Sequence, residues 1–196
     1  MHNFNFLLTK FNSWLDEAKQ HPQVVEPTAM CLATVNSYGQ PSARMVLLKK
    51  VNEQGFYFFT NDTSKKGQEI QQNRQASICF YWAQLKKQIR ITGNVIDASA
   101  SESDEYFASR PRQSQIGAWA SHQSTPMNNW QEFTDNMAEF EHKFANQQVP
   151  RPPFWRGFIV VPQTIEFWQE QDFRLHHRFL YTKQADSTWQ VQQLYP

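Results

Sequence analysis

Short apolar segments bounded by turn-forming residues recur along almost the whole of this 196-residue chain. Each segment has the length and the β-branched or aromatic composition typical of a strand, and the connections between them are mostly short. The segments predicted as strands are 29–35, 43–50, 56–60, 76–83, 88–98, 157–161, 164–169, 174–182 and 188–194. The sequence therefore predicts a mainly β fold (α+β), an antiparallel barrel with helices outside it.

Helical spacing marks the segments that flank these strands. Apolar residues at intervals of three and four predict a helix within residues 1–25, which Pro22 ends. The polar segment 64–73 is predicted as a surface helix capped by Ser64. No composition shift or linker divides the remainder, so 26–196 is predicted as a single domain.

Two further helices are predicted between the two groups of strands. Ser99 and Glu102 have the spacing of a capping box, and Pro111 must interrupt the helix that they begin. Beyond it lies an apolar stripe at helical spacing, which we interpret as core packing and not as a cofactor site. The stripe is Trp130, Phe133, Met137, Phe140 and Phe144.

Composition excludes some classes of function. Lys and Arg total 19 against 18 Asp and Glu, a net charge of +1 that argues against a general nucleic-acid binder. Sixteen Phe, seven Trp and six Tyr are enough for a large core or for flat pockets that hold ring systems. No apolar stretch approaches the roughly 20 residues of a membrane span, and no metal-ligand spacing occurs. Cys31 and Cys79 are predicted to be buried free thiols, which fits a reducing compartment such as the cytoplasm, and one disulfide between them is the alternative.

The segment 174–178 is the first candidate binding site. If it is extended, Arg174, His176 and Arg178 share one face, because side chains alternate along a strand. Two guanidinium groups and an imidazole on one face suit an anionic, planar ligand. A solvated edge strand remains the alternative.

Two other clusters could each bind a phosphate. Thr60, Lys65 and Lys66 lie at a strand end and a helix start, where free backbone N–H groups favour an anion. Surface lysines at a helix start are the alternative there. The second cluster combines a phenol, a guanidinium and a hydroxyl. It consists of Tyr106 and Arg110, four residues apart on one predicted helical face, and Ser114 after the turn at Pro111.

These residues belong to motifs that resemble pyridoxine/pyridoxamine 5′-phosphate oxidase. The resemblance runs in order from about residue 26 to residue 196, and its longest motifs are the most specific. The motifs are RMVLLK (44–49), FFTN (58–61), SKK (64–66), YFASRPRQSQIGAWAS (106–121), FWRGF (154–158), IEFWQ (165–169) and RLHHRFLY (174–181).

The resemblance implies an antiparallel split β-barrel of the FMN-binding type, a homodimer with shared FMN sites, and C-terminal strands that cover the substrate. The residues that it assigns to FMN are Arg44, Met45, Val46, Leu47, Leu48, Lys49, Phe59, Thr60, Lys65, Lys66, Gln88, Gln123, Ser124, Trp168 and Arg178. Within that set, Gln123 and Ser124 are expected to reach the flavin from the other subunit.

The resemblance also implies a substrate site for pyridoxamine or pyridoxine 5′-phosphate. Its phosphate is assigned to Lys49, Tyr106, Arg110 and Ser114, and its ring to Arg174, Leu175 and His176, of which Arg174 and His176 are the catalytic pair. Molecular oxygen would accept the electrons, giving pyridoxal 5′-phosphate and hydrogen peroxide. Neither nucleic acid nor membrane is an expected partner.

The chain departs from the family pattern in three places. Lys65 stands where Arg is common, His177 stands where Asp is usual, and no Arg precedes Arg44. Two alternatives therefore stay open: a related split-barrel flavoenzyme with another substrate, and a flavin- or pyridoxal-phosphate-binding protein without turnover.

Overall fold

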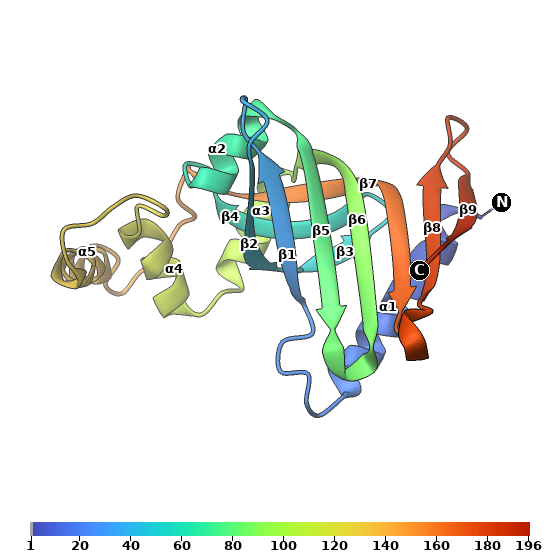
Figure 1. Ribbon diagram of the computed structural model, residues 1–196. Helices are drawn as coiled ribbons and strands as arrows, with labels where there is room; N and C mark the ends of the chain where they lie inside the picture. Colours follow the sequence, from blue (N-terminus) through green and yellow to red (C-terminus); the bar gives the residue numbers. More distant parts are fainter. Residues whose placement is uncertain (1) are drawn as a thin grey trace.

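The computed structural model describes residues 2–196, which form one antiparallel sheet with helices around it (Figure 1). The strands are β1 (Ala29–Val35), β2 (Pro41–Leu47), β3 (Lys50–Asn52), β4 (Gly55–Asn61), β5 (Gln75–Trp82), β6 (Lys87–Asp97), β7 (Trp155–Gln169), β8 (His177–Lys183) and β9 (Trp189–Leu194). Their order is β2-β1-β5-β6-β7-β4-β3, with β8 and β9 continuing from the far part of β7. The predicted mainly β, antiparallel architecture is confirmed.

The helices lie on different sides of this sheet. They are α1 (Phe4–Gln20), α2 (Lys65–Gln72), α3 (Ala100–Ala108), α4 (Arg112–Ala120) and α5 (Trp130–Lys143). The predicted caps are present: Ser64 accepts a hydrogen bond from a backbone N–H of α2, and Ser99 and Glu102 form the capping box of α3. No helix within residues 2–196 is long and apolar enough to cross a membrane.

Strand β7 is the longest element of the sheet and replaces two predicted strands. Its first half pairs with β4 and its second half with β8, while β6 follows both halves. A register shift at Gly93 lies opposite Pro162. A Cβ atom at Gly93 would lie 2.0 Å from the carbonyl oxygen of Val161, so only glycine allows this close approach. The bulge lets one strand bend through Pro162 instead of ending there.

The core has two parts. Helix α1 packs against the larger part through Leu7, Phe11 and Leu15, so the predicted N-terminal helix is integrated with the barrel. The smaller part joins α3, α4 and the start of β7 and includes Phe107 and Trp155.

Helices α4 and α5 project from one edge of the sheet as a separate lobe (Figure 1). The prediction that the apolar stripe of α5 packs in the core is only partly correct. Phe144, at the C-cap, is buried, whereas Trp130 is 65% exposed. Met137 and Phe140 are partly buried against the smaller core.

The C-terminal strand begins later than predicted. Residues Asp172–Arg174 form a short 3₁₀ turn in which Phe173 and Arg174 have φ of +55° and +63°. These left-handed conformations break the alternation before β8 starts at His177. The prediction that Arg174, His176 and Arg178 share one strand face is therefore wrong, because only Arg178 belongs to the strand.

Candidate functional site

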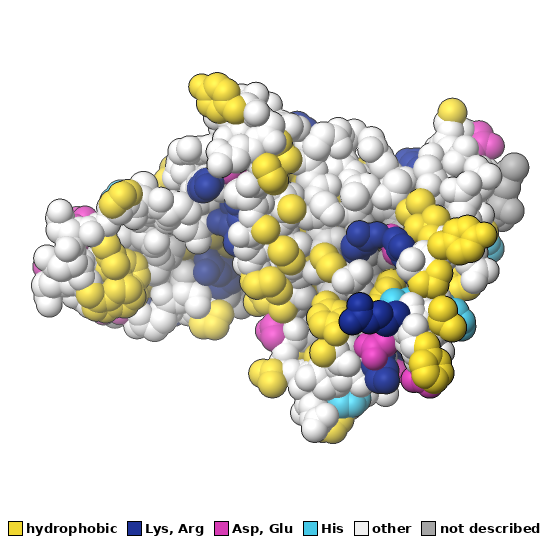
Figure 2. Space-filling model, viewed as in Figure 1, with side chains coloured by type: hydrophobic (Ala, Val, Ile, Leu, Met, Phe, Trp, Pro, Cys, Tyr) yellow, Lys and Arg dark blue, Asp and Glu magenta, His cyan; other side chains and the backbone are white. Residues whose placement is uncertain are grey.

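A cavity of about 680 Å³ lies between the β2–β4 part of the sheet and helices α3 and α4. Figure 2 shows Lys and Arg side chains gathered in the crevice between the sheet and the helical lobe. Eleven of the residues predicted from the sequence line the cavity: Met45, Val46, Leu47, Lys49, Phe59, Thr60, Lys66, Tyr106, Arg110, Ser114 and Gln123.

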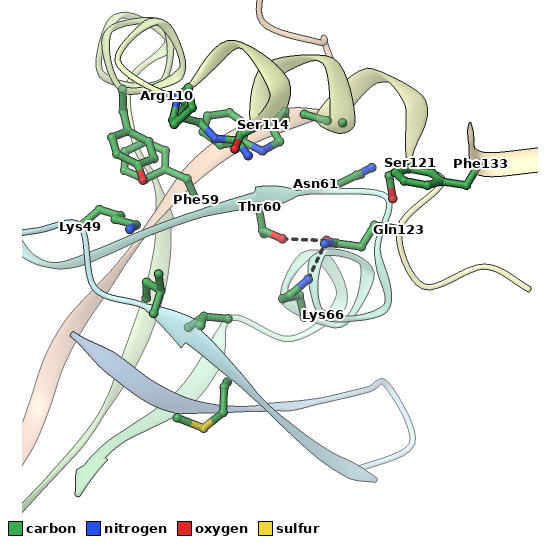
Figure 3. Close-up of a pocket in the computed structure, with 18 residues that line it drawn as sticks. Lys49, Phe59, Thr60, Asn61, Lys66, Arg110, Ser114, Ser121, Gln123 and Phe133 are labelled. Atoms are coloured by element: carbon green, nitrogen blue, oxygen red, sulfur yellow. Dashed lines mark hydrogen bonds between the residues drawn. The ribbon is translucent and has the colours of Figure 1, made fainter. Parts of the chain in front are cut away.

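One end of the cavity is a polar corner between β4 and α2. The Gln123 side-chain oxygen accepts hydrogen bonds from Thr60 Oγ1 at 3.0 Å and from Lys66 Nζ at 2.8 Å (Figure 3). Lys66 Nζ also donates to Ser64 Oγ at 3.1 Å. All four side chains belong to the same chain, so the structure places Gln123 in the cavity of its own chain, unlike the expectation that it reaches the flavin from the other subunit.

Lys66 is an unusual cation because it is buried without a carboxylate partner among its hydrogen bonds. Burial, with a smaller contribution from the nearby charge of Arg44, lowers the pKa of Lys66 to about 8. A buried ammonium group that lacks a counter-ion is stabilised by an anion. The corner is therefore suited to bind a phosphate group.

The opposite wall carries the second cluster. Tyr106 stacks on Phe59 with ring centroids 4.2 Å apart, and Lys49 Nζ lies 5.9 Å from the centre of the Tyr106 ring. The Arg110 guanidinium lies 5.0 Å from the centre of the Trp155 ring. Figure 3 shows Arg110 and Ser114 together above the cavity. Helix α3 ends at Ala108, so Tyr106 and Arg110 meet here although they do not share a helical face as predicted.

Arg110 has an unsatisfied donor. Its Nη1 is buried and has no hydrogen-bond partner among the residues that the structure describes, and burial lowers the pKa of Arg110. Buried donors of this kind are rare and carry an energetic cost. An anion in the cavity would supply the missing acceptor.

Some residues that the resemblance assigns to the cofactor do not line the cavity, and Arg44 is one of them. Arg44 is held by Glu69, whose carboxylate accepts from Arg44 Nη2 at 3.1 Å and from Ser42 Oγ at 2.6 Å. These hydrogen bonds outweigh the effect of burial and lower the pKa of Glu69. The network fixes β2 to α2 beside Lys66. Leu48, Lys65 and Ser124 are likewise not among the residues that line the cavity.

The remaining predicted residues form a separate group on the far part of the sheet. Gln88, Trp168 and Arg178 are neighbours in register across β6, β7 and β8. The His176 ring lies 4.7 Å from the Trp168 ring, between centroids. Arg174 and Leu175 are exposed in the turn that precedes β8.

Glu166 fixes the position of Arg178 in this group. The buried Glu166 carboxylate accepts from Arg178 Nε at 2.8 Å and also bonds to Arg90. The two guanidinium groups offset its burial and keep the pKa of Glu166 below its usual range.

Within one chain the two groups are far apart. Thr60, in the cavity, pairs with Arg156 of β7, and Trp168 lies twelve residues further along the same strand. At roughly 3.3 Å per residue, that length measures about 40 Å along the strand, and the bend at Pro162 makes the direct distance shorter. Figure 1 shows α4 and β8 at opposite ends of the molecule, and none of Trp168, His176 and Arg178 lines the cavity of the same chain.

Sequence reasoning missed several residues of the cavity. Phe133 points into it (Figure 3), although its place in an apolar stripe indicated core packing. Trp155 lines it from the start of β7, inside a motif that resembles the family but to which no role was assigned. The other missed residues are Asn61, Pro111, Gly117, Ala118 and Ser121, all of them within or beside the quoted motifs.

Comparison with known proteins decides the family. The profile described as Pyridoxamine 5'-phosphate oxidase matches residues 16–144, and that of the Pyridoxine 5'-phosphate oxidase C-terminal dimerisation region matches residues 155–196. This chain belongs to the pyridoxamine 5′-phosphate oxidase family. A Pyridoxine/pyridoxamine 5'-phosphate oxidase of Nostoc sp. (strain PCC 7120) is 50% identical over 187 residues, which cover 95% of this chain and 87% of that protein. A protein of the same name from Myxococcus xanthus (strain DK1622) is 48% identical over 189 residues, which cover 96% of this chain and 91% of that protein.

Two solved structures resemble the fold. PhzG from Burkholderia lata 383, in complex with tetrahydrophenazine-1-carboxylic acid, superposes with a TM-score of 0.89 at 30% identity, covering 100% of this chain and 94% of that one. An FMN-binding protein of Nostoc punctiforme related to pyridoxamine 5'-phosphate oxidase gives a TM-score of 0.75 at 18% identity. The superposition covers 94% of this chain and 96% of that protein. The expected split barrel of the FMN-binding type is confirmed.

Proposed function

We propose that this protein is an FMN-dependent oxidase that converts pyridoxamine or pyridoxine 5′-phosphate to pyridoxal 5′-phosphate. One observation carries the proposal: a single cavity holds two cationic side chains, the buried Lys66 and the half-buried Arg110 with its buried Nη1, and no carboxylate within residues 2–196 forms an ion pair with either of them. Two phosphates, one on the cofactor and one on the substrate, would satisfy both.

The residues present fit FMN. The polar corner formed by Thr60, Lys66 and Gln123 suits its phosphate, and the β2 segment from Met45 to Leu47 lines the floor on which the rest of the molecule would lie. FMN held there would supply a hydride acceptor for the substrate carbon that becomes the aldehyde, with molecular oxygen as the final oxidant and hydrogen peroxide as the second product.

The protein's own contribution is positioning. Lys49, Arg110 and Ser114 would bind the substrate phosphate at one wall and so fix the reacting carbon at one distance from the flavin. Stacked Phe59 and Tyr106 form an apolar boundary that limits access of water. No side chain has to act as a covalent nucleophile.

A homodimer would complete the site. The second group of residues, around Trp168 and His176, lies inside the region matched by the dimerisation profile. Since none of its residues lines the cavity of its own chain, we place it over the cavity of the partner, where Arg174 and His176 would cover the substrate ring and Arg178 would contact the flavin. The cytoplasmic location expected from the sequence stays a prediction.

A second candidate function follows from the similarity to PhzG, which was solved with a tricyclic carboxylic acid. A related flavoenzyme acting on such a ring would not need the phosphate cluster at Lys49 and Arg110. A protein that binds flavin without turnover is the third candidate.

One experiment separates these candidates. The purified protein is supplied with FMN and oxygen, and hydrogen peroxide and aldehyde are measured with pyridoxamine phosphate, pyridoxine phosphate, unphosphorylated pyridoxine and a reduced phenazine carboxylate. We expect turnover of the two phosphorylated substrates and little turnover of unphosphorylated pyridoxine. We also expect the protein to be a dimer that binds one FMN per subunit. Preferential oxidation of the phenazine compound would overturn the substrate assignment, and FMN binding without peroxide would overturn the catalytic one.

The lowered pKa of Lys66 predicts a pH-dependent affinity for FMN. Without ligand, Lys66 loses its proton as the pH rises through about 8, whereas a bound phosphate favours the charged form. FMN binding above pH 8 should therefore take up a proton, and the Kd should rise by up to about tenfold per pH unit, the limit for one coupled proton. Quenching of FMN fluorescence between pH 7 and 9.5 measures this.

The matched control is Lys66→Arg, because a guanidinium stays charged throughout this range. Its Kd should vary less with pH than that of the unaltered protein. Identical pH profiles for the two proteins would show that Lys66 does not titrate with binding.

A further inference from the structure

The two cysteines are directly opposite each other in the sheet. Cys31 of β1 is the register partner of Cys79 of β5. The next pair along, Leu32 and Ile78, is fully buried on the inner face, so alternation places both thiols on the outer face. Both are free and only partly buried. The thiols are free, as predicted, but they are half-buried and not fully buried, so only the burial part of the prediction is wrong.

This arrangement meets the geometric requirement for a disulfide. Directly opposed residues of antiparallel strands have Cα atoms about 4.5–5.5 Å apart, and disulfides span Cα distances of about 4.4–6.8 Å. Opposed Cβ atoms, about 4.5–5.5 Å apart, would have to approach by only about 1 Å to reach the usual disulfide spacing. The two strands need no change of register.

A small oxidant can reach the pair. Cys31 and Cys79 together line a hollow of about 510 Å³ on the outer face, beside Met45 and Tyr81, which are 63% and 58% exposed. Burial, and then the proximity of Cys31, raises the pKa of Cys79. Because the thiolate is the reactive form, oxidation should accelerate as the pH rises.

We propose that Cys31 and Cys79 form a reversible disulfide across β1 and β5, with a peroxide as the oxidant. One thiolate attacks the peroxide oxygen, giving a sulfenic acid and, from hydrogen peroxide, water. The other thiolate displaces the sulfenic oxygen as a second water and closes the S–S bond. In total the two thiols lose two protons and two electrons, and these reduce one hydrogen peroxide to two water molecules. A dithiol reverses the step by exchange.

The site lies next to the flavin-binding floor. Register pairs run in one row from Met45, which lines the cavity, through Cys31 and Cys79 to Arg90 and Glu166. A disulfide here would covalently link β1 to β5. Both strands belong to the row of paired residues that runs from the cavity to Glu166, whose carboxylate accepts a hydrogen bond from Arg178. The proposal does not depend on the proposed oxidase activity, because the peroxide can be added.

The test treats the full-length protein with hydrogen peroxide, alkylates it under denaturing conditions without reductant, and measures intact and peptide masses. We expect the loss of two hydrogen atoms, no alkylation at either cysteine, and one linked peptide pair containing Cys31 and Cys79. Dithiothreitol should restore two alkylatable thiols, and the reaction should be faster at pH 9 than at pH 7.

The controls are Cys31→Ser and Cys79→Ser, which cannot form the bond and should instead gain oxygen at the remaining thiol. Oxygen adducts on both cysteines of the unaltered protein, a covalent dimer on a non-reducing gel, or two thiols that stay alkylatable when the serine variants are oxidised would each overturn the proposal.

Discussion

Replacing Arg110 with alanine is expected to lower kcat/KM for pyridoxamine 5′-phosphate by a factor equivalent to about 2–5 kcal/mol, the cost of losing one partner of a desolvated charge pair. Arg110 has a buried, unpartnered Nη1 at the cavity wall. A substrate phosphate gives that donor its acceptor, so the variant loses an interaction that water does not replace. FMN should stay bound, because the polar corner of Lys66 and Gln123 is untouched.

The substrate itself provides the sharpest control. Unphosphorylated pyridoxine lacks the group that Arg110 would bind, so its slow oxidation should be nearly the same in the variant and in the unaltered protein. Arg74→Ala removes an exposed ion pair with Asp97 and should have little effect on either substrate. An equal loss for pyridoxine and its phosphate would show that Arg110 supports the wall and does not bind phosphate.

Local sequence signals predicted the elements whose structure is decided locally. Strand β1 has its predicted bounds, and Ser64 and Ser99 cap helices at the expected positions, because a cap depends on residues three positions away. The bend of β7 was missed because it depends on how β7 pairs with β6: the register shifts between Thr92 and Gly93, and Gln163 of β7 is left out of the pairing. The turn before β8 was missed because Phe173 and Arg174 are not residues that favour positive φ.

The residues of the candidate site also fall into those that local motifs predict and those whose position depends on tertiary structure. The family-like motifs indicated candidate binding residues, and eleven of these residues line one cavity. Two placements depend on tertiary structure and could not be read from the sequence. Gln123 bonds to Thr60 and Lys66 of its own chain, and Trp168 lies on a distant part of the sheet. We therefore propose that the C-terminal group, and not Gln123, is the part of the site that the partner subunit contributes.

Substitutions in that C-terminal group are expected to cause the second large loss of activity. Replacing Arg174 or His176 with alanine should lower kcat/KM on the order of a hundredfold, because even a slight misplacement of the reacting carbon has that cost. His176 packs against Trp168, and the left-handed turn at Arg174 presents the two side chains from one short segment. FMN content should fall less than activity, since neither side chain belongs to the phosphate corner.

His177 is the matched comparison because it is adjacent in sequence and differs in position. It is exposed and is the first residue of β8, where side chains alternate, so it lies on the opposite face from Arg178. His177→Asp should therefore change kcat/KM by less than about tenfold, or about 1.4 kcal/mol of barrier. Steady-state kinetics of Arg174→Ala, His176→Ala and His177→Asp, measured together with thermal unfolding, decide the matter. If His177→Asp is as damaging as the other two in a protein that remains folded, the active face includes His177, and the departure from the family's usual Asp is functional.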